Sequence, residues 1–185
     1  MTNSSANAAL LEQLLSSTNS QFTEEQAVIG LFSELRHPLL RYVLTFGLSA
    51  HDAEEIVQEG FLQLFKHLQR GKSRANLPGW IFRVCHNLAL KHLDRARRSN
   101  AACDGAATAI DQSLNPEELL VEAQRRQKLQ AVLRALPEQD RYCVCLRAEG
   151  LRYRDIADIL GISLGAVSLS LVRSFARFAR ADQEC

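Results

Sequence analysis

The feature that most constrains the fold is a pair of helical patterns joined by a tight turn near the C-terminus, at residues 150–181. Apolar residues recur at helical spacing over about 153–160, and again over about 164–181. Between them, Gly161 permits a left-handed helix end, and Ser163 is a good N-cap for the second helix. This spacing predicts a helix-turn-helix, the motif whose second helix lies in the major groove of DNA.

The second helix of this motif would supply the residues that contact DNA. It carries three arginines and no acid before Asp182, which suits a surface that faces phosphates. An ordinary helical hairpin with a solvated cationic side is the alternative interpretation of this segment alone. The candidate DNA-contacting residues are Ser163, Leu164, Gly165, Ala166, Ser168, Leu169, Ser170, Arg173 and Arg177.

Charge is segregated along the chain, although the formal net charge is only +1. Residues 52–59 contain four acids and no Lys or Arg, whereas residues 70–98 contain eight Lys or Arg and one acid. Segregated charge indicates separate surfaces for separate partners.

Both charged segments belong to predicted amphipathic helices. A helix at about 50–69 has a continuous apolar stripe, and its opposite face is acidic and polar. A loop at 71–77 leads into a helix at about 78–98 whose outer face is basic. Taken alone, either polar face is also typical of a plain solvated helix.

Helical periodicity accounts for most of the remaining chain, and no segment shows the alternation of a strand. A capping box at Thr23–Gln26 opens a helix to about Phe46, in which Pro38 predicts a kink or break. We therefore predict an all-α fold. Its parts would be a mobile N-terminal extension (1–21), two small helical domains (22–98 and 116–185) and a flexible linker between them (99–115).

Several classes of function are excluded by what the sequence lacks. The five cysteines form neither a disulfide framework nor a zinc-binding spacing, so we expect reduced thiols, no metal and no cofactor. No apolar run is long enough to insert into a membrane, and no N-terminal signal is present, which predicts a cytoplasmic protein. No nucleophile motif or acid–base cluster supports an enzyme.

Two sets of motifs resemble the conserved regions of a known family, and they occur in its order. His51–Phe61 and Leu77–Leu93 are similar to the second conserved region of bacterial sigma factors, and Leu136–Arg141 with Gly150–Arg180 is similar to the fourth. Two such regions with a short linker are typical of the extracytoplasmic-function (ECF) group. The resemblance implies a non-enzymatic subunit that directs RNA polymerase to promoters and helps to open the DNA.

The resemblance also assigns partners to the charged surfaces. The C-terminal domain would meet the β flap of core RNA polymerase and read the upstream promoter DNA, and an anti-sigma factor is a further partner of such proteins. The residues that would dock on the β′ coiled coil are Asp52, Glu55, Gln58 and Glu59. The residues that would capture the opened promoter strand are Lys72, Ser73, Arg74, Asn76, Trp80, Arg83, Asn87 and Lys91. Trp80 is equally well suited to anchor the core.

The chain departs from the family pattern at several positions. Ser168 and Ser170 stand where many relatives carry a basic residue early in the recognition helix, which predicts weaker or differently specific upstream contacts. His92 stands where an acid is frequent, and Gly60 where a larger aliphatic residue is common. The alternative function is a stand-alone helix-turn-helix regulator that binds duplex operator DNA without polymerase, although no dimerisation heptads or ligand domain support it.

Overall fold

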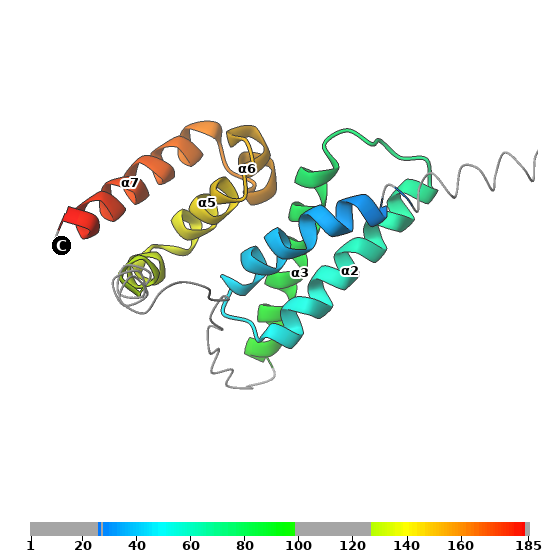
Figure 1. Ribbon diagram of the computed structural model, residues 1–185, viewed down its shortest axis with the longest axis horizontal. Coiled ribbons are helices and arrows are strands. Elements are labelled where there is room, and N and C mark those ends of the chain that lie inside the picture. The colour runs from blue at the N-terminus through cyan, green and yellow to red at the C-terminus, as the bar shows by residue number, and fades with distance from the viewer. Residues whose placement is uncertain (1–25, 27, 99–126, 184–185) are drawn as a thin grey trace, which may run out of the picture.

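A computed structural model describes residues 26, 28–98 and 127–183, and this part of the chain is helical without a strand. A helix at residues 28–44 precedes α2 (Ala50–Gln69) and α3 (Leu77–Arg98). A helix at 127–135 precedes α5 (Glu138–Ala148), α6 (Tyr153–Leu160) and α7 (Leu164–Gln183). Figure 1 shows the two resulting units, one running from blue to green and the other from yellow to red. The predicted all-α fold is confirmed, while the predicted extension and linker lie outside the described residues.

The first unit is built on the crossing of α2 and α3. Ser49 caps α2, its hydroxyl oxygen accepting the Asp52 N–H at 3.1 Å. The buried face of α2 is the predicted apolar stripe: Ala53, Ile56, Val57, Gly60, Phe61, Leu64 and Leu68. A Cβ atom on Gly60 would lie 2.6 Å from the Cys85 sulfur, so the two helices approach closely at this pair. This contact explains why no larger aliphatic residue fits at Gly60.

The helix at 28–44 continues across Pro38 without the predicted break. It ends in a turn at 45–47, where Gly47 has φ +77° and its N–H donates to the Leu44 carbonyl at 3.1 Å. The predicted end at Gly47 is therefore present. A break at Pro38 is wrong, and a kink there stays a prediction.

The second unit contains the predicted helix-turn-helix. Helix α6 ends at Gly161, which adopts a left-handed conformation with φ 65°. Helix α7 leaves at 106° to α6, and the Ser163 hydroxyl oxygen accepts the Ala166 N–H at 3.2 Å as its N-terminal cap. Val167 and Leu171 of α7 are fully buried against the rest of the unit. The motif is confirmed in its helices, its turn and its capping residues.

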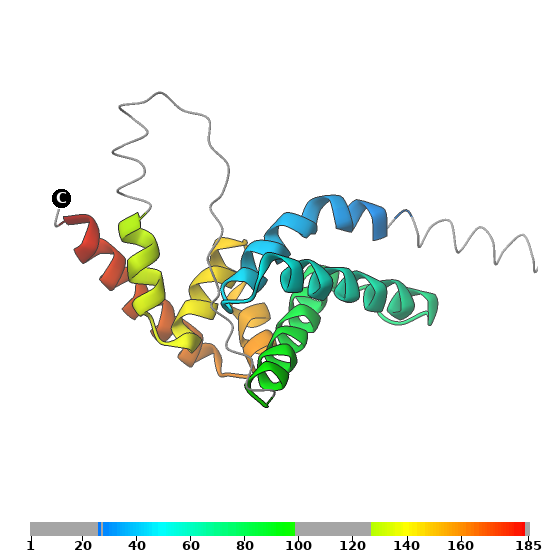
Figure 2. The ribbon, with the colours of Figure 1, turned by 90° about the horizontal axis from the view of Figure 1, so that it is seen from below.

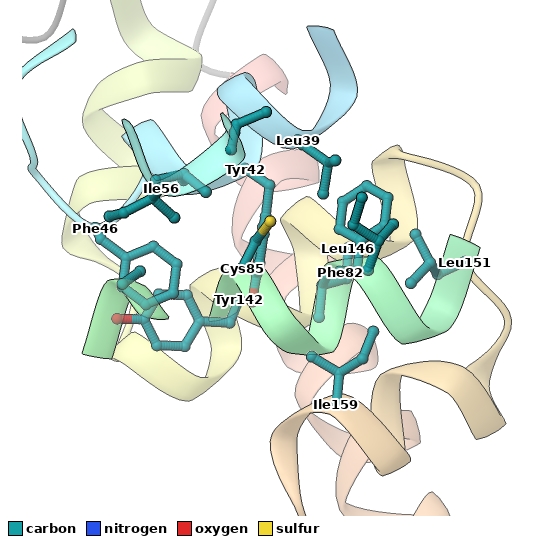
Figure 3. Close-up of a cluster of buried hydrophobic side chains, with 14 of the residues drawn as sticks. Leu39, Tyr42, Phe46, Ile56, Phe82, Cys85, Tyr142, Leu146, Leu151 and Ile159 are labelled. Carbon is teal, nitrogen blue, oxygen red and sulfur yellow. The ribbon is translucent and has the colours of Figure 1, made fainter. Parts of the chain in front are cut away.

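The two units share one hydrophobic core, which the sequence did not predict. The Phe46 ring stacks on the Tyr142 ring, with centroids 4.5 Å apart, and the two side chains lie face to face in Figure 3. Arg41 closes the same boundary by donating two hydrogen bonds to the Glu149 carboxylate, at 2.9 and 2.6 Å. Figure 2 shows the second unit lying directly against the first. The described helices therefore form one body with two parts.

A buried hydrogen bond lies at the centre of this boundary. The Tyr42 oxygen and the His86 Nδ1 atom are 2.7 Å apart, and both side chains are buried. Burial lowers the pKa of His86 to about 4, so its ring is neutral at pH 7. Burial also raises the pKa of Tyr42, which keeps its proton. We assign the Tyr42 hydroxyl as the donor and the His86 Nδ1 atom as the acceptor. The centroids of the His86 and Tyr142 rings are 5.5 Å apart.

This histidine predicts a loss of stability in mild acid. An unfolded chain protonates the residue near pH 6.5, whereas the folded chain does so only near pH 4. The contribution of neutral His86 to the free energy of unfolding is therefore complete above pH 6.5. It falls as the pH drops toward 4, and at pH 5 it is smaller by about 2 kcal/mol. Urea unfolding at pH 7.5 and pH 5, compared between wild type and His86→Gln, measures this difference. Equal losses in the two proteins would contradict the assignment.

Candidate functional site

The acidic face of α2 divides into exposed residues and residues with a local structural role. Glu55 and Gln58 are exposed, and the Glu55 carboxylate lies 3.3 Å from the Nε2 atom of the exposed His51 one turn earlier in α2. Asp52 accepts the Ser49 hydroxyl at 2.6 Å and lies 3.5 Å from the His92 Nε2 atom, so it helps to hold the start of α2 against α3. Glu59 accepts a 3.0 Å hydrogen bond from the side chain of Gln63 and is half-buried. The open part of this face is therefore centred on Glu55 and Gln58.

The loop between α2 and α3 brings the first predicted strand-capturing residues together. Lys72, Ser73 and Arg74 are exposed, and the Ser73 carbonyl oxygen lies 3.0 Å from the His67 Nε2 atom. His67 in turn packs against Trp80, with ring centroids 4.5 Å apart. Trp80 is half-buried against the core, which supports its role as an anchor while leaving part of the ring open.

Asn76 performs two structural tasks at the end of this loop. Its side-chain oxygen accepts the Gly79 N–H at 3.2 Å, which caps α3, and its φ of 51° is left-handed. Its amide nitrogen donates to the Asp155 carboxylate at 2.7 Å, across the boundary between the two units. A Cβ atom on Gly79 would collide with this side chain at 2.4 Å, so glycine is required beside it.

The basic face of α3 is open to solvent. Arg83, Asn87 and Lys91 are exposed at i, i+4 and i+8, and so form one row along the helix. A row of this kind can follow the phosphates of a nucleic-acid strand, while the loop and Trp80 lie at its start. The structure thus brings all eight predicted strand-capturing residues onto the loop and one side of α3.

One residue of α7 that was predicted to contact DNA, Ser170, is not accessible to DNA in the structure. Ser170 is fully buried, and its hydroxyl donates to the Asp140 carboxylate of α5. Arg173 donates to the same carboxylate at 3.0 Å. The sequence held a signal for this placement, because residue 170 lies three positions after Val167 and four before Ser174, both of which face inward. Ser163, Leu164, Gly165, Ser168, Leu169 and Arg177 are exposed, and Ala166 is half-buried.

The sequence reasoning also missed the apolar character of the exposed side of α7. Leu164, Leu169, Val172 and Phe175 are each 50–63% exposed. None of the described helices is long and apolar enough to cross a membrane alone, and only α6 and α7 taken together, bent by 106°, have the length and composition for it.

The described residues offer no group of three His, Cys, Asp or Glu side chains that could hold a metal ion. The three thiols that the structure describes are held in their protonated form, because burial raises the pKa of Cys85 to about 12 and that of Cys145 to about 11, and raises that of Cys143. Their surroundings are those of packed core residues rather than of reactive nucleophiles.

Comparison with known proteins identifies both units. A family model described as Sigma-70 region 2 matches residues 31–99, and one described as Sigma-70, region 4 matches residues 126–178. The chain is 33% identical over 152 residues to the ECF RNA polymerase sigma factor SigE of Mycolicibacterium smegmatis, covering 78% of this chain and 59% of that relative. It is 25% identical to the RNA polymerase sigma-H factor of Pseudomonas aeruginosa, covering 82% of this chain and 83% of the relative.

Two solved structures share the fold. The structure of CnrH in complex with the cytosolic domain of CnrY matches with a TM-score of 0.60 and 21% identity, covering 91% of this chain and 95% of that one. The sigma factor RpoE from Bartonella quintana, crystallised with the anti-sigma factor NepR, matches with a TM-score of 0.63 and 21% identity, covering 83% and 94%.

The burial of Ser170 predicts a structural effect of its removal. In Ser170→Ala the buried Asp140 carboxylate loses one donor, so we expect the free energy of unfolding to fall by about 1–3 kcal/mol. Ser168→Ala, an exposed position on the same helix, is the matched control and should change it by less than about 0.5 kcal/mol. Urea denaturation measures both. Equal stability of the two variants would contradict the buried role of Ser170.

Proposed function

Because the chain belongs to the sigma-70 family of RNA polymerase sigma factors and to its ECF group, we propose that it directs bacterial RNA polymerase to specific promoters. The observation that carries the proposal is the presence of both sigma regions, in order, with an exposed acidic surface on one and a helix-turn-helix in the other. The protein would act in the cytoplasm as a dissociable initiation subunit without catalysis of its own.

The proposed polymerase-docking surface is the open part of the acidic α2 face. Glu55 and Gln58 project from a helix that is fixed on its other side by the core, so a partner meets a rigid surface. Carboxylates on such a surface steer and orient a basic partner more than they add affinity. The β′ coiled coil is the proposed contact here, and the β flap is the proposed contact of the second unit.

The proposed strand-capturing surface is the α2–α3 loop with the basic row of α3. Lysine and arginine side chains would follow the phosphates, and the exposed part of Trp80 and the loop would hold an unstacked base. Asn76 can take part only after its hydrogen bond to Asp155 breaks. We therefore propose that the two units separate when promoter DNA opens.

The proposed duplex-reading surface is the exposed side of α7. Ser163 and Ser168 can donate hydrogen bonds to phosphates or bases, and Leu164 and Leu169 can contact thymine methyl groups. Arg177 adds an exposed cation further along the helix. An anti-sigma factor is a further proposed partner, in line with the RpoE–NepR complex of the same fold. The stand-alone regulator is not favoured, because such a protein has no use for a sigma region 2.

Co-elution with core RNA polymerase tests the proposal and its docking surface together. Wild type should form a stable complex on a size-exclusion column, and Glu55→Lys/Gln58→Lys should lose it, since both residues are exposed and neither caps a helix. The matched control, Glu34→Lys/Gln69→Lys, makes the same change of charge at exposed positions elsewhere on the first unit. Loss in both variants would refute this docking surface, and no complex with wild type would refute the function.

Ser168 is exposed in the recognition helix, so replacing it by a cationic residue should increase the affinity for DNA. Ser168→Arg adds one phosphate contact, so the plot of log affinity for duplex DNA against log salt should steepen by about 0.9. Gln139→Arg, exposed on α5, is the control and should leave the slope unchanged. Fluorescence anisotropy over a range of salt concentrations measures the slope. An unchanged slope in Ser168→Arg would mean that this side of α7 does not face DNA.

A further inference from the structure

One side chain contacts both the α2–α3 loop and Trp80, although it is not itself a candidate DNA-contacting residue. His67 is half-buried in the last turn of α2. Its Nε2 atom lies 3.0 Å from the Ser73 carbonyl oxygen, and its ring centroid lies 4.5 Å from that of Trp80, with the two planes tilted by 43°. A carbonyl oxygen can only accept, so His67 donates this hydrogen bond. The same ring therefore contacts the backbone of the loop and one side of the indole.

The backbone of His67 also anchors the start of the loop. Its carbonyl oxygen accepts the Lys72 N–H at 3.4 Å, and the Leu68 carbonyl oxygen accepts the Gly71 N–H at 2.9 Å. This pair of bonds is the Schellman motif, which ends a helix with a left-handed residue, and Gly71 has φ 62°. The loop is thus tied to one turn of α2 by the main chain at its start and by the imidazole at Ser73.

The middle of the loop is exposed, so a tie to a helix matters there. Residues 71–76 are all exposed, and burial contributes little to fixing their backbone. The Ser73 hydroxyl oxygen accepts the Ala75 N–H at 3.2 Å, which forms a turn within the loop without joining it to a helix. The Asn76 side chain caps α3 at the far end. The His67 side chain thus ties α2 to the middle of the loop.

We propose that His67 is a positioning residue for the strand-capturing surface, an inference that rests on the proposed function of that surface. Because one ring contacts both Ser73 and Trp80, the loop and the indole are held at a fixed separation in the free protein. A base that stacks on the open part of Trp80 then meets loop side chains that are already in place. Binding therefore loses less conformational entropy, and the affinity for a single strand rises without a direct contact from His67 to DNA.

Two replacements of His67 separate the effect of its hydrogen bond from that of its ring. His67→Gln keeps an N–H donor that can reach the Ser73 carbonyl oxygen but has no aromatic ring. His67→Phe keeps a ring beside Trp80 but has no donor. His67→Ala removes both. Gln69→Ala, an uncharged and exposed position in the same turn of α2, is the matched control.

Hydrogen exchange of the full chain tests the positioning without DNA. The amides of Lys72 and Ala75 both donate hydrogen bonds in the loop. We expect them to exchange several-fold faster in His67→Ala and His67→Phe than in wild type, because the tie from α2 to Ser73 is lost. His67→Gln and Gln69→Ala should keep the wild-type rates. Equal rates in all variants would mean that the imidazole does not fix the loop.

Binding of single-stranded DNA tests the consequence for strand capture. The probe is a labelled single-stranded oligonucleotide pool of mixed sequence, and its anisotropy gives the dissociation constant. We expect the constant to rise by about tenfold in His67→Ala, the effect of ordering about one backbone residue on binding. His67→Gln should recover most of this loss, and Gln69→Ala should bind as wild type does. The affinity for the same pool as duplex should stay unchanged in every variant, since α7 is the proposed duplex-reading surface.

Trp80 is the only tryptophan of the chain, so its fluorescence reports directly whether a base stacks on this ring. Equal single-strand affinities of wild type and His67→Ala would overturn the inference. An equal fall in duplex affinity, or a loss that His67→Gln does not recover, would also overturn it. If wild type bound no single strand and its Trp80 fluorescence did not change, the proposed strand capture would fail. The exchange of Lys72 and Ala75 would still decide whether His67 fixes the loop.

Discussion

The structure depends on the buried contact between Tyr42 and His86, which ties the first helix to α3 at the surface where the second unit packs. Around it, Phe46 and Tyr142 bring aromatic rings from both units into one cluster. Burial keeps the histidine neutral and the tyrosine protonated, so the hydrogen bond places no charge in the core. Because this cluster is shared, it holds the first helix and α3 against α5 of the second unit.

The same boundary occupies residues that the proposed function needs. Asn76 caps α3, lies in the strand-capturing loop and donates to Asp155 of α6. Arg41 holds Glu149 beside it. A polar pair at the edge of an apolar contact is easier to separate than the contact itself, so these bonds would break first when the units part. The closed arrangement thus has a strongly apolar centre and a polar edge that includes one proposed DNA-binding residue.

Local features of the fold could be predicted from the sequence, whereas contacts between distant segments could not. The left-handed Gly161, the Ser163 cap and the apolar stripe of α2 follow from short-range rules of helix geometry, and all are present. The partner of Ser170 is Asp140, 30 residues away, and only the three-dimensional packing of α5 on α7 brings them together. The shared core was missed for the same reason, because Tyr42 and Tyr142 are 100 residues apart and neither breaks an amphipathic pattern.

The most direct test of the account is transcription in vitro with core RNA polymerase, the purified chain and a library of bacterial DNA fragments. We expect the chain to direct synthesis from a small set of fragments on which core polymerase alone is inactive. Their start sites should share two sequence elements, as expected for a protein with separate strand-capturing and duplex-reading surfaces. Tight binding to duplex DNA with no specific transcript under any condition would contradict it.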